Sequence, residues 1–401
     1  MSRENRVSIP ITGLGSVSSF GPCRGLIAEQ DSKPRVIHEI PAQGIRKAFV
    51  VQPFRPADVV PGLKTRRLDR LSVWSLIAAH LAMQDAHIDL EKEDRFRFGV
   101  VFGTGYGCVE LTEAYLKKVA GVGYGNADPI VFPETLDNSP ASHVARVLGL
   151  RGPNLTLSCR GISGEAALIQ GASLLHGGEA DRILVLAGDT LNRPLYEWYE
   201  AAGVLSASCY AEHEGPVPFT SGGDGFVPGE GLAAVVMETD GAYAGRGAHA
   251  YARFRLGRMG ADPEVAPFAW GECSELTAAL VREVLGAARP AKATRVVASA
   301  NGSPRLDEQE ARAIQMVFGP LGVGNIAAPK ALIGEFDGNA ILRLILALSG
   351  LGIRVNPQGG PGLASAVSVD DSSLQDSEES VLLLLGASTG GSRAALSFSL
   401  P

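Results

Sequence analysis

A cysteine stands at a strand-to-helix turn in the stretch TLSCRGISGE, residues 156–165. Apolar residues lead into this turn, Gly161 lies within it, and a helical pattern opens directly after it. A thiol at such a turn is a candidate nucleophile, because the positive end of the following helix lowers the pKa of a nearby thiol. Cys159 is therefore the first candidate for covalent chemistry. The alternative is a small buried apolar side chain without a chemical role.

Basic side chains gather just before a long helical pattern. The cluster consists of Lys64, Arg66, Arg67 and Arg70. Such a concentration of positive charge can receive an acidic protein surface, because opposite charges steer the encounter of two proteins. The alternative is a solvated helix face that binds nothing.

The bulk composition excludes several classes of protein. The chain has 401 residues, is 45% hydrophobic and carries a net charge of -7, which argues against a nucleic-acid-binding protein with a basic face. Its five cysteines show neither paired spacing nor a CxxC motif, which favours reduced thiols and no metal or other cofactor. The first residues lack the apolar segment of a signal peptide, and no apolar run reaches the ~20 residues of a membrane span. We therefore predict a soluble, cytoplasmic protein.

Short apolar strands alternate with helical patterns along the chain. The predicted strands cover 6–15, 97–107, 181–189, 231–238, 295–302 and 380–388, and the clearest helices cover 67–86, 163–178, 274–288 and 339–352. This alternation predicts an α/β fold, and helices that are nearly all apolar predict a buried helical layer between sheets. The segment GAYAGRGAHA at 241–250 is interpreted as a boundary between an N-terminal half, 1–245, and a C-terminal half, 246–401.

Several ordered segments resemble landmarks of the β-ketoacyl synthases, which belong to the thiolase superfamily. They are ITGLGSVSSFG (11–21), RRLDRLSVWSLIAA (66–79), SHVARVLGLRGPNLTLS (142–158), DGFVPGEGLAAVVME (224–238) and GASTGGSRAALSF (386–398). The resemblance implies a thiolase-like, duplicated α-β-α-β-α layered fold that is usually dimeric. It also implies a chemistry that needs a cysteine to accept the acyl chain and two histidines to support decarboxylation.

The resemblance further implies that all three catalytic positions have changed. When both ends of the family's elbow motif are matched without a gap, the nucleophile position falls on Gly161. The first histidine position falls on Asn301, or on Ser299 by a second alignment, and the second falls on Glu335. None of the seven histidines lies beyond residue 249, whereas the family draws both catalytic histidines from its C-terminal half. No catalytic residue is therefore predicted.

The other residues of the implied acyl pocket are Cys159, Lys330 and Thr389. Cys159 stands two residues before the nucleophile position and is interpreted as a bystander. Lys330 and Glu335 are predicted to form a buried ion pair at the former oxyanion site, and Thr389 replaces a phenylalanine that gates the pocket in the family. Gly161 is expected to leave extra room, which would lengthen a cavity rather than fill it.

The resemblance implies a ketosynthase-like subunit of a type II fatty acid or polyketide synthase that has lost condensation chemistry. It would act as a chain-length factor in a dimer with an active β-ketoacyl synthase, pairing through the strand near Pro153–Ser158. Lys64, Arg66 and Arg67 would contact an acyl carrier protein. Three alternatives remain open: a residual malonyl-carrier-protein decarboxylase, an acyltransferase that uses Cys159, and a homodimeric acyl-binding scaffold. Fatty acids, aromatic polyketides and polyenes are all compatible products.

Overall fold

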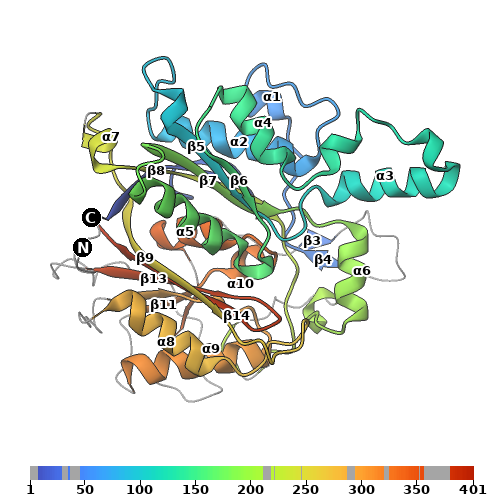
Figure 1. The fold of residues 1–401 in the computed structure, drawn as a ribbon. Helices are drawn as coiled ribbons and strands as arrows, with labels where there is room; N and C mark the ends of the chain where they lie inside the picture. Colours follow the sequence, from blue (N-terminus) through green and yellow to red (C-terminus); the bar gives the residue numbers. More distant parts are fainter. Residues whose placement is uncertain are drawn as a thin grey trace.

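Two sets of five strands with the same order form the framework of the described residues in the computed structural model (Figure 1). The first set has the order β6-β5-β7-β8-β1, and the second has the order β11-β10-β13-β14-β9. In each set the first three strands run parallel, and the last two run antiparallel to their neighbours. The first set comprises β1 (Ile9–Ser18), β5 (Phe98–Gly103), β6 (Asn154–Leu157), β7 (Arg182–Asp189) and β8 (Gly231–Glu238). The second comprises β9 (Ala252–Ala261), β10 (Thr294–Val297), β11 (Asn325–Ala328), β13 (Val381–Ala387) and β14 (Ser392–Ser399).

The two sets are joined where β1 pairs with β9, for example at Ile9 and Phe254. Short strands extend the edges: β2 (Gly21–Arg24) pairs with β1, and β12 (Ile353–Val355) pairs with β11. Strands β3 (Arg35–Val36) and β4 (Lys47–Ala48) form a separate pair. The structure describes residues 8–28, 35–36, 46–210, 218–220, 222–244, 246–286, 294–319, 325–351, 353–355 and 380–401.

Helices cover both faces of each strand set, so that the elements stack in five layers (Figure 1). Helix α5 (Ser163–His176) lies between the sheets beside α11 (Ala340–Leu348), whereas α2 (Arg70–Asp85) and α4 (Ser139–Leu148) cover the outer face of the first set. Helices α8 (Ser274–Leu285) and α9 (Pro304–Phe318) cover the outer face of the second. Strands β5, β7 and β8 are buried throughout, as expected for strands with helices on both faces. The predicted duplicated, layered α/β fold is confirmed.

The predicted strands and helices all appear, with ends that shift by a few residues, and residues 6–7, 287–288 and 352 of the predicted elements lie outside the described residues. The remaining α-helices of the described residues are α1 (Pro56–Val59), α3 (Val109–Val122), α6 (Arg193–Ala201), α7 (Asp240–Ala244) and α10 (Lys330–Ile333). The predicted boundary after residue 245 falls between α7 and β9, and the two halves as separate units remain a prediction. No helix in the described part of the chain is both long enough and apolar enough to cross a membrane.

One buried arginine connects the helical layer to the second strand set. Arg343 on α11 forms an ion pair with Glu165 on α5, and neither side chain is exposed to solvent. The Arg343 guanidinium also donates hydrogen bonds to the carbonyl oxygens of Ala298 and Leu385, at 3.1 and 2.6 Å. Burial raises the pKa of the Glu165 carboxyl, and the positive charge of Arg343 opposes that rise. The guanidinium therefore holds both central helices against the ends of β10 and β13.

The variant Arg343→Met is expected to lower the free energy of unfolding by about 3–5 kcal/mol, because it leaves the Glu165 carboxylate buried without a partner. Chemical denaturation followed by circular dichroism measures this loss. The double variant Arg343→Met with Glu165→Gln should recover part of it, since the unpaired charge is then gone. A single variant as stable as the wild type would contradict this role of Arg343.

Candidate functional site

The turn that carries Cys159 is a tight elbow between β6 and α5. The three residues Arg160–Ile162 form one turn of 3-10 helix directly before α5, and Arg160 has a left-handed backbone with φ of 52°. Ser163 holds the elbow, because its hydroxyl accepts a hydrogen bond of 2.9 Å from the Cys159 amide and lies 2.6 Å from the Arg160 carbonyl. The predicted strand-turn-helix arrangement is confirmed.

Gly161 has no spare room around it. A Cβ atom added there would lie 2.8 Å from the carbonyl oxygen of Ala387 and 3.2 Å from Cβ of Ser388. The Gly161 amide also donates a hydrogen bond of 3.2 Å to the Ser388 hydroxyl. The expectation that glycine lengthens a cavity is therefore wrong, because the end of β13 and the residue after it occupy the space that a side chain would fill.

Cys159 does not have the environment of an activated thiol. It is half-buried, and burial raises the pKa of its thiol. The expectation that the following helix lowers this pKa is wrong, because Cys159 lies before the 3-10 turn and the desolvation of its thiol dominates. A thiol with a raised pKa remains largely protonated at neutral pH and is a poor nucleophile.

The residues at the two implied histidine positions contact each other. Oε2 of Glu335 accepts hydrogen bonds from Asn301 Nδ2 at 2.6 Å and from Lys330 Nζ at 2.7 Å. Its Oε1 accepts one from Asn339 Nδ2 at 3.2 Å, and Lys330 also donates to the hydroxyl of Ser299 at 3.1 Å. The predicted buried pair of Lys330 and Glu335 is confirmed. The carboxylate has donors on both oxygens and little exposure to solvent.

This cluster is fixed by carboxylates of helix α9. Glu310 accepts hydrogen bonds from the amides of Ser299 and Ala300 at 2.8 and 2.7 Å, and Asp307 accepts one from the Asn301 amide at 3.0 Å. Burial raises the pKa of Asp307 to about 6 and that of Glu310 to about 7. On the other side, Arg343 donates to Oδ1 of Asn339 at 2.6 Å. Hydrogen bonds thus connect the cluster to both central helices.

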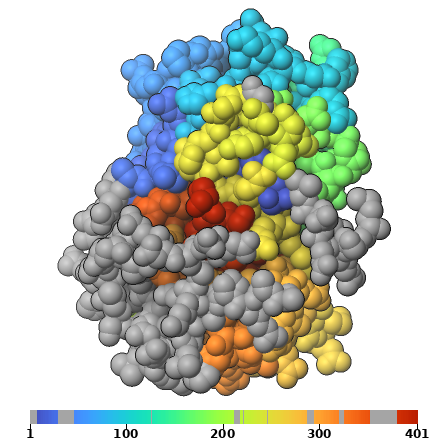
Figure 2. All heavy atoms as spheres, turned by 90° about the vertical axis from the view of Figure 1, so that its left-hand side faces the viewer, coloured from blue at the N-terminus to red at the C-terminus, as the bar shows by residue number. Residues whose placement is uncertain are grey.

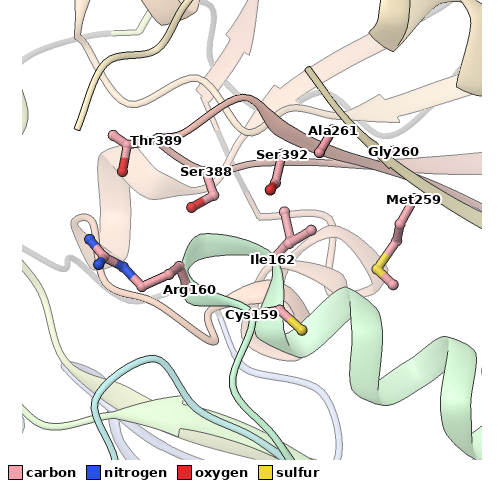
Figure 3. A pocket seen from close by; sticks show the side chains of 9 residues that line it. All are labelled: Cys159, Arg160, Ile162, Met259, Gly260, Ala261, Ser388, Thr389 and Ser392. Atoms are coloured by element: carbon pink, nitrogen blue, oxygen red, sulfur yellow. The ribbon is translucent and has the colours of Figure 1, made fainter. Parts of the chain in front are cut away.

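A pocket of 480 Å³ opens at the elbow (Figure 3). Its lining residues come from the elbow, from the end of β9 and from the turn between β13 and β14: Cys159, Arg160, Ile162, Met259, Gly260, Ala261, Ser388, Thr389 and Ser392. Of the predicted acyl-pocket residues, Cys159 and Thr389 line this pocket, and Gly161 lies between two of its lining residues. The other three form the cluster around Glu335 and are not among the lining residues.

The sequence analysis did not single out two charged side chains beside the elbow, Arg160 and Asp337. Asp337, between α10 and α11, lies with its Oδ2 3.6 Å from Nε of Arg160, and this oxygen accepts no hydrogen bond from any described residue. Burial raises the pKa of Asp337 to about 7, while the charge of Arg160 opposes the rise. The sequence could have indicated Asp337, because this residue stands two positions after Glu335 and adds a second carboxylate to the same buried loop.

The predicted carrier-contact residues are neither among the lining residues of the pocket nor among the hydrogen-bond partners of Glu335. Figure 2 shows another face of the molecule, on which the N-terminal half lies above the C-terminal half. Lys64, Arg66 and Arg67 are at least partly exposed in the segment between α1 and α2. Arg70 differs, because it forms ion pairs with Glu230 (2.7 Å) and Glu110. It therefore does not belong to the exposed cluster.

Several known sequences are similar to this chain. A model of the β-ketoacyl synthase N-terminal domain matches residues 25–242. The 3-oxoacyl-[acyl-carrier-protein] synthase 2 of Staphylococcus aureus (strain COL) is 26% identical over 356 residues, which cover 84% of this chain and 83% of that protein. The synthase 2 of Vibrio harveyi is 26% identical over 251 residues, which cover 61% of this chain and only 60% of that relative.

Solved structures share the fold over nearly the whole chain. The ishigamide ketosynthase/chain length factor matches with a TM-score of 0.81 at 20% identity, over 99% of this chain and 100% of that one. A beta-ketoacyl synthase from Burkholderia phymatum STM815 matches over the same shares, with a TM-score of 0.81 at 19% identity. At such low identity these matches show a common thiolase-like fold.

The variant Gly161→Ala is expected to reduce the free energy of unfolding by about 1–3 kcal/mol, because the new methyl group meets the backbone of Ala387. Gly241→Ala is the matched control, since a Cβ at that position meets nothing within 4 Å. Thermal unfolding measures both variants. Equal melting temperatures for the two would contradict the close packing at Gly161.

Stability is expected to fall as the pH rises from about 4 to about 7. Asp337 has a folded-state pKa of about 7 against an ordinary value of 3.8, so the folded protein binds more protons than the unfolded chain between those values. The stabilisation is complete below pH 3.8 and is lost as the pH passes through about 7. Melting temperatures across this range should decline less steeply for Asp337→Asn. The exposed Asp58→Asn should keep the wild-type slope, and a wild-type slope in Asp337→Asn would contradict this effect.

Proposed function

Because the chain belongs to the β-ketoacyl synthase family, we propose that it is a ketosynthase-like subunit of a type II fatty acid or polyketide synthase that no longer catalyses condensation. In this proposal it acts as a chain-length factor in a dimer with an active β-ketoacyl synthase. The name of one protein of the same fold, the ishigamide ketosynthase/chain length factor, supports this role.

The observation that carries the proposal is the set of hydrogen bonds around Glu335. Condensation requires a cysteine that accepts an acyl group and donors that stabilise an enolate oxyanion. The aligned nucleophile position is Gly161, which has no room for a side chain. Asn301 and Glu335 stand at the aligned histidine positions. The Glu335 carboxylate accepts hydrogen bonds from Asn301 and from Lys330. A carboxylate at this position would repel an enolate rather than stabilise it.

The proposed dimer is supported by an unpaired edge and an apolar surface. Strand β6 ends the first strand set, and in the described residues its outer edge has no partner strand. No residue of α3 is buried, although this helix and the segment after it carry large apolar side chains. The exposed ones are Leu116, Val122, Tyr124, Ile130, Phe132 and Leu136. Open strand edges and apolar surfaces of this kind favour association with another chain.

The proposed carrier-protein contact is supported by the side chains of Lys64, Arg66 and Arg67, which are at least partly exposed. Each offers a cation to an acidic partner surface. A further solved structure, "AntDE:AntF (apo): type II PKS acyl-carrier protein in complex with its ketosynthase bound to the hexaketide", shares this fold at 19% identity with a TM-score of 0.80. We extend a carrier-protein contact to this chain on that basis.

The test combines turnover with co-purification. The purified chain is expected to produce no β-ketoacyl product from acyl- and malonyl-carrier protein, measured by mass spectrometry of the carrier. Co-expression with a ketosynthase from the same gene neighbourhood should yield a stable complex that is active, and Cys159→Ala in this chain should leave its activity unchanged. Robust condensation by the chain alone that Cys159→Ala abolishes would overturn the proposal.

The alternatives give distinct results in the same experiments. Loss of carbon dioxide from malonyl-carrier protein without condensation would indicate a decarboxylase. An acyl group found on Cys159 would indicate an acyltransferase, which the raised pKa of that thiol disfavours. A homodimer that binds acyl groups but no ketosynthase would indicate a scaffold.

A further inference from the structure

Helix α3 and the segment after it, residues 109–136, form an arm that projects from the body of the protein (Figure 1). We call these residues the α3 arm. None of the 14 residues of α3 is buried, and the helix packs mainly against two short 3-10 turns of the same arm, Tyr124–Asn126 and Phe132–Thr135. A segment with so few buried contacts to the body can detach locally at a small cost in free energy.

The start of the α3 arm is attached to the start of α2 by two neighbouring contacts. Oδ2 of Asp69 accepts a hydrogen bond of 3.0 Å from the Leu111 amide, while its Oδ1 accepts one of 2.8 Å from the Leu71 amide. Beside this carboxylate, the Glu110 carboxyl contacts the Arg70 guanidinium. Because both contacts join adjacent residues of α3 to adjacent residues at α2, they form a single joint.

Three carboxylates surround the one guanidinium of this joint. Arg70 donates hydrogen bonds to both oxygens of Glu230, at 3.3 and 2.7 Å. Glu230 also accepts hydrogen bonds of 3.0 Å from the Val51 and Leu191 amides. Glu110 contacts the same guanidinium but accepts no amide hydrogen bond from any described residue. Since one guanidinium neutralises one negative charge, Glu110 is the carboxylate in excess.

The other charged side chains near the joint have partners of their own. Lys117 on α3 forms an ion pair with Glu113, which also accepts a hydrogen bond of 3.0 Å from Asn192. At the far end of the α3 arm, Glu134 lies 2.5 Å from His143 on α4. Within the described ranges of the chain, Arg70 is therefore the cation that faces Glu110.

The protonation of Glu110 is coupled to the attachment of the α3 arm. Burial raises the pKa of Glu110 from 4.5 to about 7, the charges of Asp69 and Glu230 add to this rise, and that of Arg70 opposes it. In a detached arm the carboxyl is solvated and returns to its ordinary pKa. The attached state thus binds more protons, so attachment is favoured at low pH and is weakened as the pH rises through about 7.

We propose that the α3 arm is a pH-responsive element, which lies against α2 while Glu110 is protonated and detaches at its first turn when Glu110 ionises. Asp69 and Glu230 stay charged in both states, because each accepts two amide hydrogen bonds. The arm carries the exposed apolar side chains of the proposed dimer surface, and its effect on association therefore rests on the proposed function. The movement itself does not.

Hydrogen exchange of the full chain, followed by mass spectrometry, tests the movement. Labelling times at each pH are scaled to the intrinsic exchange rate, so that only the opening of the structure is compared. Peptides from α3 are expected to open at least about tenfold more at about pH 8 than at about pH 5, since such an equilibrium changes by up to about tenfold per pH unit between the two pKa values. Peptides from α8 should change far less. A flat profile for α3, or an equal change in α8, would overturn the proposal.

The variant Glu110→Gln should flatten the profile of α3 and keep it as protected at about pH 8 as the wild type is at about pH 5. The matched control is Glu275→Gln, which neutralises an exposed carboxylate in the first turn of α8 and should keep the wild-type profile of α3. The α8 peptides also report whether Glu110→Gln folds. If it does not, Glu110→Met replaces it, with the same flat profile expected. A neutral variant that retains the pH dependence would contradict the role of Glu110.

This experiment uses the chain alone, and its outcome is separate from the turnover assay. Condensation by the chain alone would overturn the proposed function and leave the pH profile of the α3 arm intact. A flat exchange profile would overturn the pH-responsive arm and leave the absence of condensation intact.

Discussion

The interior of this protein is organised around a buried carboxylate that must be neutralised. Glu335 receives hydrogen bonds from Asn301, Lys330 and Asn339, and Asn339 in turn accepts one from Arg343. An isolated charge at this depth would destabilise the fold by several kcal/mol, so these partners are obligatory. Because they come from the loop after β10, from α10 and from the residue just before α11, satisfying one carboxylate fixes three segments together.

In both strand sets, buried carboxylates accept hydrogen bonds from the loop that follows an equivalent strand. After β5, the carboxylate of Asp189 accepts hydrogen bonds from Thr104 Oγ1 at 2.6 Å and from the amides of Gly105 and Tyr106. After β10, the equivalent strand of the second set, Asp307 and Glu310 accept hydrogen bonds from successive amides. In both places a buried acidic side chain orders the loop at the carboxyl end of a parallel strand. This edge of a parallel sheet is where α/β proteins usually build their sites.

The sequence was sufficient to predict the fold, since its strands are apolar on both faces and its central helix α11 is apolar almost all round. The sequence was also sufficient to predict the ion pair of Lys330 and Glu335, because these two opposite charges lie near the two ends of the short helix α10 and have few other partners at that depth. It could not predict the surroundings of Gly161. Those depend on Ala387 and Ser388, more than two hundred residues away, and the approach of their strand is a property of tertiary packing. The ion pair of Arg160 with Asp337 was missed for the same reason.

The close approach of Ala387 to Gly161 also bears on how this chain could change. A single codon change could supply a cysteine at position 161, yet its side chain would meet backbone that is already in place. A side chain at this position would require the turn between β13 and β14 to move away at the same time. The packing at this position therefore couples two segments that lie far apart in the sequence, so that neither can change freely without the other.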